Sequence, residues 1–161
     1  MLALSTLLAE CRAQAKTIPA EQPSKATPAQ GSRDTIEYQN KQYGFTVRLP
    51  VSWKGFTVVQ EEWSGSNGSA VVAHGPLLLL RHPKWTKDNP RQDIPIMIFT
   101  LAQWKDVDDG DVAVSAAPIP PTELDHNGKY VFALPPRYNF ALAEGWEEVQ
   151  KIMDGKPLSA F

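Results

Sequence analysis

Four side chains carry the donor atoms of an acid–base or metal site: His82, Asp93, Asp125 and His126. Two imidazoles and two carboxylates are enough ligands for one zinc ion. However, none of the four falls in a spaced motif such as two histidines four residues apart, and no serine or cysteine in a nucleophile context accompanies them. We therefore expect no metal, no cofactor and no catalytic residues. A metal-dependent hydrolase built on His82, Asp93 and His126 is kept as the weaker alternative.

A run of acidic residues, Asp106-Val-Asp-Asp-Gly-Asp111, invites comparison with a calcium-binding loop. An EF-hand loop requires glycine at its sixth position and glutamate at its twelfth. Counted from Asp106, Gly110 is fifth and Ala117 is twelfth, so a solvated acidic turn is the better interpretation. Neither a Gly-x-Gly-x-x-Gly nor a Gly-Lys-Ser/Thr sequence occurs, which argues against nucleotide hydrolysis.

The residues between Arg81 and Asp93 form the most distinctive stretch of the chain. They gather positive charge around one aromatic side chain, and our candidate binding residues are Arg81, His82, Lys84, Trp85, Lys87 and Arg91. Loops held by a rigid sheet are frequent binding sites, and exposed Trp and Arg are strong interface anchors. We expect the partner to be a protein or an anionic component of the cell envelope. The alternative is that Trp85 folds back onto the core while the cations only solvate the loop.

The first eleven residues resemble a lipoprotein signal. The apolar stretch Leu2–Ala9 leads into Leu8-Ala9-Glu10-Cys11, which resembles the lipobox whose cysteine becomes the lipidated N-terminus. Residues 12–35 are predicted to be a flexible tether, because prolines and small polar residues leave little apolar surface to bury. This layout predicts an exported chain anchored to the membrane through Cys11. A cytoplasmic protein with a frayed tail and an incidental cysteine is the alternative, since no basic residue precedes the apolar stretch.

Length and composition narrow the class of protein. The chain has 161 residues, which favours one domain after the tether. Sixteen basic and eighteen acidic residues give a net charge of -2, which argues against a nucleic-acid partner. No apolar run approaches the ~18 residues of a membrane-spanning helix, so we expect no transmembrane helix. Fourteen prolines favour short strands over long helices, and a single cysteine excludes an internal disulfide.

From residue 36 to residue 161 the pattern predicts a single α+β domain. Alternating or continuously apolar residues predict strands at 36–41, 45–49, 56–63, 77–81, 94–101 and 129–134. Gly65–Gly68 and Asn127-Gly128 are predicted turns, and Trp104 closes the strand that starts at Ile94. Apolar spacing from Leu142 to Met153 predicts a helix that Gly155 and Pro157 end. The side chains expected in the core are Phe45, Val47, Leu49, Trp53, Ile96, Ile98, Phe132 and Trp146.

Two stretches resemble the PsbP-like superfamily. Tyr43-Gly-Phe-Thr-Val-Arg-Leu-Pro-Val-Ser-Trp-Lys54 is similar to that family's opening hairpin, in which a Gly-Phe strand runs into a proline and a tryptophan. A last strand followed by a helix with Glu147-Glu148-Val149, and the closing Ser159-Ala160-Phe161, also look like that family. The middle of the domain looks more like small bacterial lipoproteins with the same opening hairpin.

The resemblance implies an α-β-α sandwich, a mainly antiparallel sheet on which a C-terminal helix packs, and a role as a non-catalytic accessory subunit. Together with the N-terminal layout, it leads us to expect an exported, lipid-anchored accessory or binding module of the bacterial cell envelope. A cytosolic protein-interaction domain is the second possibility, which would follow if the N-terminus is not a signal.

Overall fold

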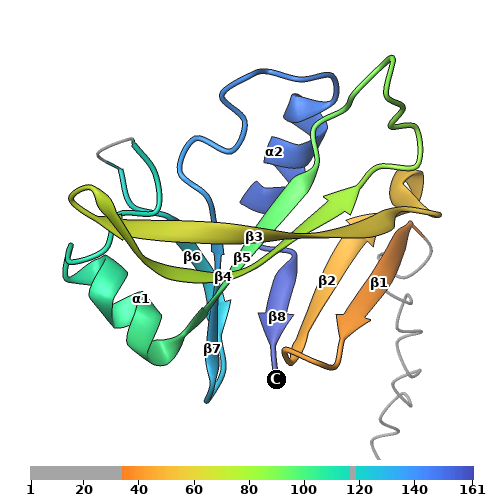
Figure 1. Ribbon diagram of the computed structural model, residues 1–161. Helices are drawn as coiled ribbons and strands as arrows, with labels where there is room; N and C mark the ends of the chain where they lie inside the picture. The colour runs from red at the N-terminus through yellow and green to blue at the C-terminus, as the bar shows by residue number, and fades with distance from the viewer. Residues whose placement is uncertain (1–33, 117–118) are drawn as a thin grey trace, which may run out of the picture.

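Eight strands form two antiparallel sheets in the part of the chain that the computed structural model describes, residues 34–116 and 119–161 (Figure 1). The segment 1–11, with Cys11, and the predicted tether up to residue 33 lie outside the described residues. The predicted fold class, α+β with a mainly antiparallel sheet and a C-terminal helix, is confirmed.

The smaller sheet has the strand order β1-β2-β8. Its strands are β1 (Thr35–Asn40), β2 (Phe45–Pro50) and β8 (Leu158–Ala160). At the β1–β2 turn, the side-chain oxygen of Asn40 accepts a hydrogen bond from the Tyr43 N–H at 3.1 Å. Gly44 has φ 80°, and a Cβ there would lie 2.7 Å from the Phe161 carbonyl oxygen. Glycine is therefore required where the turn meets the chain's end.

The larger sheet has the order β3-β4-β5-β7-β6, and every neighbouring pair is antiparallel. Its strands are β3 (Thr57–Asn67), β4 (Ala70–Arg81), β5 (Ile94–Thr100), β6 (Thr122–His126) and β7 (Tyr130–Leu134). Asn127 makes the predicted β6–β7 turn, because its side-chain oxygen accepts the N–H of Lys129 at 2.9 Å and that of Tyr130 at 3.0 Å.

Strands β3 and β4 are longer than the sequence predicts, and each contains a glycine against which a neighbouring side chain packs. A Cβ on Gly75 would lie 2.8 Å from the indole of Trp63, its cross-strand neighbour. A Cβ on Gly65 would lie 2.5 Å from the Val112 side chain. Because these glycines have no side chain, neighbouring side chains can pack directly against their backbone. β3 continues to Asn67, so the loop predicted at Gly65–Gly68 is wrong for residues 65–67.

A helix, α1 (Leu101–Asp108), follows β5 where the sequence predicts the end of a strand and an acidic turn. The Thr100 hydroxyl accepts the Gln103 N–H at 3.2 Å, and the Gln103 side chain accepts the Thr100 N–H at 2.9 Å. This capping box starts the helix immediately after the strand. Asp106–Asp108 therefore belong to a helix, and Lys105 forms an ion pair with Asp109 one turn later.

The C-terminal helix, α2 (Trp146–Asp154), is shorter at its start than the sequence predicts and ends before Gly155 as expected. Leu142 has φ 47° and Gly145 has φ 82°, and these left-handed conformations keep the preceding residues out of the helix. Leu142 is 60% exposed for this reason, and Trp146, expected in the core, is only half-buried.

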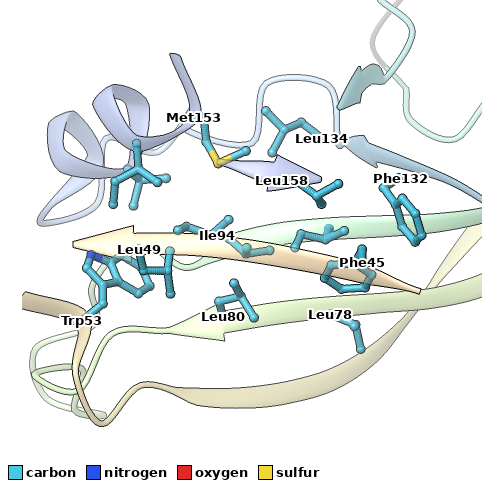
Figure 2. Packing of buried hydrophobic residues seen from close by; sticks show 14 of the residues in the cluster. Phe45, Leu49, Trp53, Leu78, Leu80, Ile94, Phe132, Leu134, Met153 and Leu158 are labelled. Atoms are coloured by element: carbon cyan, nitrogen blue, oxygen red, sulfur yellow. The ribbon is translucent and has the colours of Figure 1, made fainter. Parts of the chain in front are cut away.

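The main hydrophobic cluster lies between the two sheets and α2 (Figure 2). It contains every other side chain that we expect in the core, from β2, β5, β7 and the short 3-10 turn Val51–Trp53. A second cluster covers the opposite face of β5, where Met97 and Phe99 pack against Trp63 and Val107 of α1. The Trp63 indole N–H donates to the Ile98 carbonyl at 2.8 Å.

A helix covers part of each face of the five-stranded sheet. One face of the five-stranded sheet is covered by α1, and the other by α2 together with the three-stranded sheet. Side chains of the smaller sheet, such as Ile36, Phe45 and Leu158, thus supply part of the cover on the face that also carries α2.

Replacing Phe132 by Ala should lower the free energy of unfolding by about 3–5 kcal/mol, the range for emptying a buried aromatic site. Phe132 is 0% exposed and its ring centroid lies 4.8 Å from that of Phe45. Urea denaturation of the full chain measures the change. Phe140→Ala is the matched control, because Phe140 is 77% exposed and its loss should change stability little. A loss below ~1 kcal/mol for Phe132→Ala would contradict the packing.

Candidate binding surface

Loop 82–93 connects two neighbouring strands, β4 and β5, and an arginine closes its base. The Arg81 guanidinium donates to both carboxylate oxygens of Asp93, through Nη2 at 2.8 Å and Nε at 3.2–3.3 Å. Both side chains are largely shielded, with 24% and 12% exposure, and the hydrogen bond to Asp93 raises the pKa of Arg81. This bidentate pair fixes the two ends of the loop relative to each other.

Trp85 lies against the same arginine. The guanidinium carbon of Arg81 is 4.0 Å above the centroid of the Trp85 ring, and the indole is half-buried. Among the described residues, Trp85 belongs to neither hydrophobic cluster. One face of the indole is therefore held by a cation–π contact with Arg81, while part of the ring remains accessible.

His82, which the sequence places among the binding residues, lies inside the molecule. It is 4% exposed and meets the Trp53 indole edge to face, with ring centroids 5.0 Å apart. Its Nδ1 accepts a hydrogen bond from the Lys84 N–H at 3.1 Å. Burial lowers the pKa of His82, and the nearby Arg91 lowers it further, so the ring is neutral. His82 supports the base of the loop and does not belong to its exposed surface.

Arg91 joins the loop to the start of α2. Its guanidinium forms an ion pair with Glu144 and lies 3.8 Å from the Glu148 carboxylate. A Cβ on Gly145 would lie 2.7 Å from Arg91 Nη2, so the guanidinium occupies the space above this glycine. The Gln92 N–H also donates to the Glu144 carbonyl at 2.8 Å. Arg91 is only 14% exposed and acts as a structural link between two loops.

The remaining two candidates are free to meet a partner. Lys84 and Lys87 are both exposed, and within residues 34–116 and 119–161 neither has an ion-pair partner. They lie on either side of Trp85 in sequence. The structure therefore separates the six candidates into an accessible group, Lys84, Trp85 and Lys87, and a supporting group, Arg81, His82 and Arg91.

A second segment, 135–145 between β7 and α2, shares this surface, and the sequence analysis missed it. The Gln92 side chain donates to the Tyr138 carbonyl at 3.1 Å, next to the Arg91–Glu144 link. A pocket of about 330 Å3 lies where the two segments meet, lined by Leu79, Arg91, Gln92, Asp93, Pro95, Pro135, Tyr138 and Ala143. The sequence signal that could have revealed this segment is Gly145. A glycine can stand at the beginning of a helix as well as interrupt one, and Gly145, with φ 82°, directly precedes α2.

The side chains proposed for a hydrolase do not meet. His82 follows β4 at the end where Leu80 pairs with Ile94, whereas His126 pairs with Val131 near the opposite end of β5. Asp93 is engaged by Arg81, and His126 Nδ1 lies 2.7 Å from Glu123. In the described part of the chain, no group of three or more histidine, cysteine or carboxylate side chains is placed to hold a metal ion.

Asp125 is engaged in structure as well. One carboxylate oxygen accepts the Ala160 N–H at 2.8 Å and the other accepts the His126 N–H at 2.9 Å. Through the first of these bonds, β6 of the larger sheet holds β8 of the smaller one. The residues of the weaker alternative are thus divided between two ends of the sheet, and the geometry does not assemble a hydrolase site from them.

The chain matches no protein-family model, no curated protein and no solved structure in the three comparisons made. The PsbP-like resemblance therefore stays a prediction. Within the described residues, no helix has the length and apolar character needed to cross a bilayer.

Lowering the pH through the range below about 6.5 should destabilise the fold through His82. Because burial lowers the pKa of His82 from its ordinary 6.5, the unfolded chain binds a proton there more readily than the folded chain. Stability is then fully present above about pH 6.5 and is lost as the pH falls, by at most ~1.4 kcal/mol per pH unit.

Urea denaturation of the full chain at a series of pH values measures this slope. His82→Asn is the comparison, since its side-chain oxygen keeps an acceptor for the Lys84 N–H but does not titrate. The variant should show a flatter dependence than the native chain between about pH 7 and pH 5. Equal slopes in both proteins would show that His82 is not the group responsible.

Proposed function

We propose that this chain is an exported, lipid-anchored and non-catalytic binding module of the bacterial cell envelope. Its recognition surface is the loop 82–93, and its partner carries negative charge. The observation that carries this proposal is Trp85, a half-buried indole outside both core clusters, which stands between two exposed lysines.

The way the loop is held supports recognition. Arg81 and Asp93 close its base, and Arg91 attaches it to Glu144 beside α2. A loop fixed at both ends loses little conformational freedom when a partner binds, so more of the contact energy appears as affinity. Trp is one of the residues that most often dominate binding energy.

Export and lipid anchoring are supported by the sequence, through the lipobox-like Leu8-Ala9-Glu10-Cys11. A cytosolic interaction domain is the alternative for the same surface. Metabolic labelling of cells that produce the full chain with a palmitate analogue distinguishes the two. We expect label on the chain and its loss in Cys11→Ser. An unlabelled chain recovered from the cytoplasm would favour the alternative.

Removing the two exposed lysines should weaken binding to an anionic envelope partner. The test uses the full chain, immobilised and exposed to solubilised bacterial envelope, with captured material quantified at low and high salt. Lys84→Gln/Lys87→Gln should reduce both capture and its salt dependence, because exposed charges attract over roughly 8–10 Å at physiological salt. Lys41→Gln/Lys129→Gln is the matched control, since both lysines are exposed in turns at the other end of the molecule.

Trp85→Ala tests the anchor itself. If the indole contacts the partner, the variant should lose about 2 kcal/mol or more of binding free energy. Its unfolding free energy should change much less than that of Phe132→Ala, because Trp85 lies outside both clusters. Unchanged capture, after correction for the folded fraction, would show that the recognition surface lies elsewhere.

A further inference from the structure

We propose that the segment 137–142 docks on the surface of a bilayer that contains anionic lipids, together with the lysines of loop 82–93. This rests on the proposed function, because it names the anionic partner of the same surface. The partner is thus the headgroup region of a membrane, which the segment enters with apolar side chains.

The segment 137–142, in the connection between β7 and α2, exposes large apolar side chains. Phe140 is 77% exposed, the largest exposure given for a large apolar side chain in the described residues, and Leu142 is 60% exposed. Ala141 between them is exposed as well. A contiguous exposed apolar patch on a folded domain marks an interaction surface more often than a single exposed side chain does.

The backbone conformation of the segment accounts for the exposure of Phe140 and Leu142. Of the three non-glycine residues with positive φ in the described chain, Arg137 (φ 53°) and Leu142 (φ 47°) stand on either side of Phe140. Such conformations each cost of order 1 kcal/mol or more and persist where the surroundings impose them. Here they turn the chain twice, and the residues between them include Tyr138, which packs against the main cluster, and the exposed Phe140 and Ala141.

Hydrogen bonds hold the segment in this shape. Gln150 of α2 accepts from the Asn139 side-chain amide at 2.8 Å and from the Tyr138 hydroxyl at 3.2 Å. Within the segment, the Phe140 N–H donates to the Arg137 carbonyl at 2.9 Å. Phe140 and Leu142 are therefore presented on a fixed support, as an insertion element needs to be.

The cations of loop 82–93 share the same end of the molecule. β4 and β7 are both antiparallel to β5 and hence parallel to each other, so the loops that follow them leave the sheet at one end. Both loops lie beside the start of α2 in Figure 1, and the Arg91–Glu144 pair connects them. Three exposed cations accompany the apolar tip: Arg137 within the segment, and Lys84 and Lys87 on the neighbouring loop.

This combination fits the interface of an anionic bilayer. Phe and Leu gain free energy by entering the boundary between headgroups and acyl chains, and Trp is favoured at that depth. Lysine and arginine beside them are attracted by anionic headgroups, with an effect that falls off within a Debye length. Two apolar side chains and three cations give weak and reversible docking, which suits a domain already held near the membrane.

The test is flotation of the full chain carrying Cys11→Ser, so that no acyl chain contributes, with two kinds of vesicle. We expect the chain to float with vesicles of phosphatidylglycerol and phosphatidylcholine, and at least about tenfold less with phosphatidylcholine alone. Phe140→Ser/Leu142→Ser should reduce binding to the anionic vesicles by about tenfold or more. Circular dichroism of each variant verifies the fold.

Val71→Ser/Val72→Ser is the matched control, because these valines of β4 are 70% and 55% exposed and lie away from the segment. It should float like the parent chain. Absence of flotation with anionic vesicles, or equal flotation of the Phe140/Leu142 variant, would overturn the proposal. So would equal binding to both kinds of vesicle, since the cations would then have no role.

A further comparison separates this proposal from the proposed function. If Lys84→Gln/Lys87→Gln loses capture of solubilised envelope protein while no chain floats with vesicles, the loop recognises a protein and only the membrane proposal fails. If flotation depends on Phe140 and Leu142 but capture does not change in the lysine or Trp85 variants, loop 82–93 is not the recognition surface and the membrane contact stands alone.

Discussion

The burial of β5 on both faces is the constraint on which the rest of the structure depends. Six consecutive residues, Ile94–Phe99, are buried, so each face of the strand needs an apolar cover. One face receives β2, β8 and α2, and the other receives Trp63 and α1. Because β5 also has an antiparallel neighbour on each side, β4 and β7 point the same way. Their two loops therefore emerge together, and the candidate surface is a consequence of how the core is built.

Which charged side chains of loop 82–93 face solvent depends on how each one is buried and paired, and not on how many of them the sequence places there. Arg81 and Arg91 each use the planar guanidinium to hold a carboxylate, which an arginine does with less loss of side-chain freedom than a lysine. Both are shielded, and their charges are largely balanced by Asp93 and Glu144. Lys84 and Lys87 remain solvated and unpaired among the described residues. Thus the arginines shape the loop, and the lysines carry its solvent-exposed positive charge.

Strands in which apolar and polar residues alternate, such as Phe45–Pro50, were predictable from the sequence. There the two-residue alternation indicates a strand, and the proline marks its end. The helix α1 was not, since its Thr100–Gln103 capping box directly continues an apolar strand and leaves no turn residues between them. The full length of β4 was not predictable for a different reason: Trp63, twelve positions before Gly75, fills the space beside this glycine, and only the cross-strand register reveals the contact. The loop 82–93 was chosen as a candidate surface from its composition. The segment 135–145 was not, because the order of strands in the sheet brings the two loops together and the sequence does not show that order.

The left-handed residues of the segment 135–145 explain why its apolar side chains stay outside. An unconstrained Phe-Ala-Leu stretch next to a hydrophobic cluster would bury its side chains, gaining roughly 1.5–3 kcal/mol for each large one. Instead, the bends at Arg137 and Leu142 and the hydrogen bonds to Gln150 hold a backbone conformation in which Phe140 and Leu142 are exposed. The same Gln150 side chain donates to Asp154 at 2.8 Å, one turn further along the exposed side of α2. The position of Phe140 thus depends on α2, because two of the hydrogen bonds that hold its segment end on Gln150 of that helix.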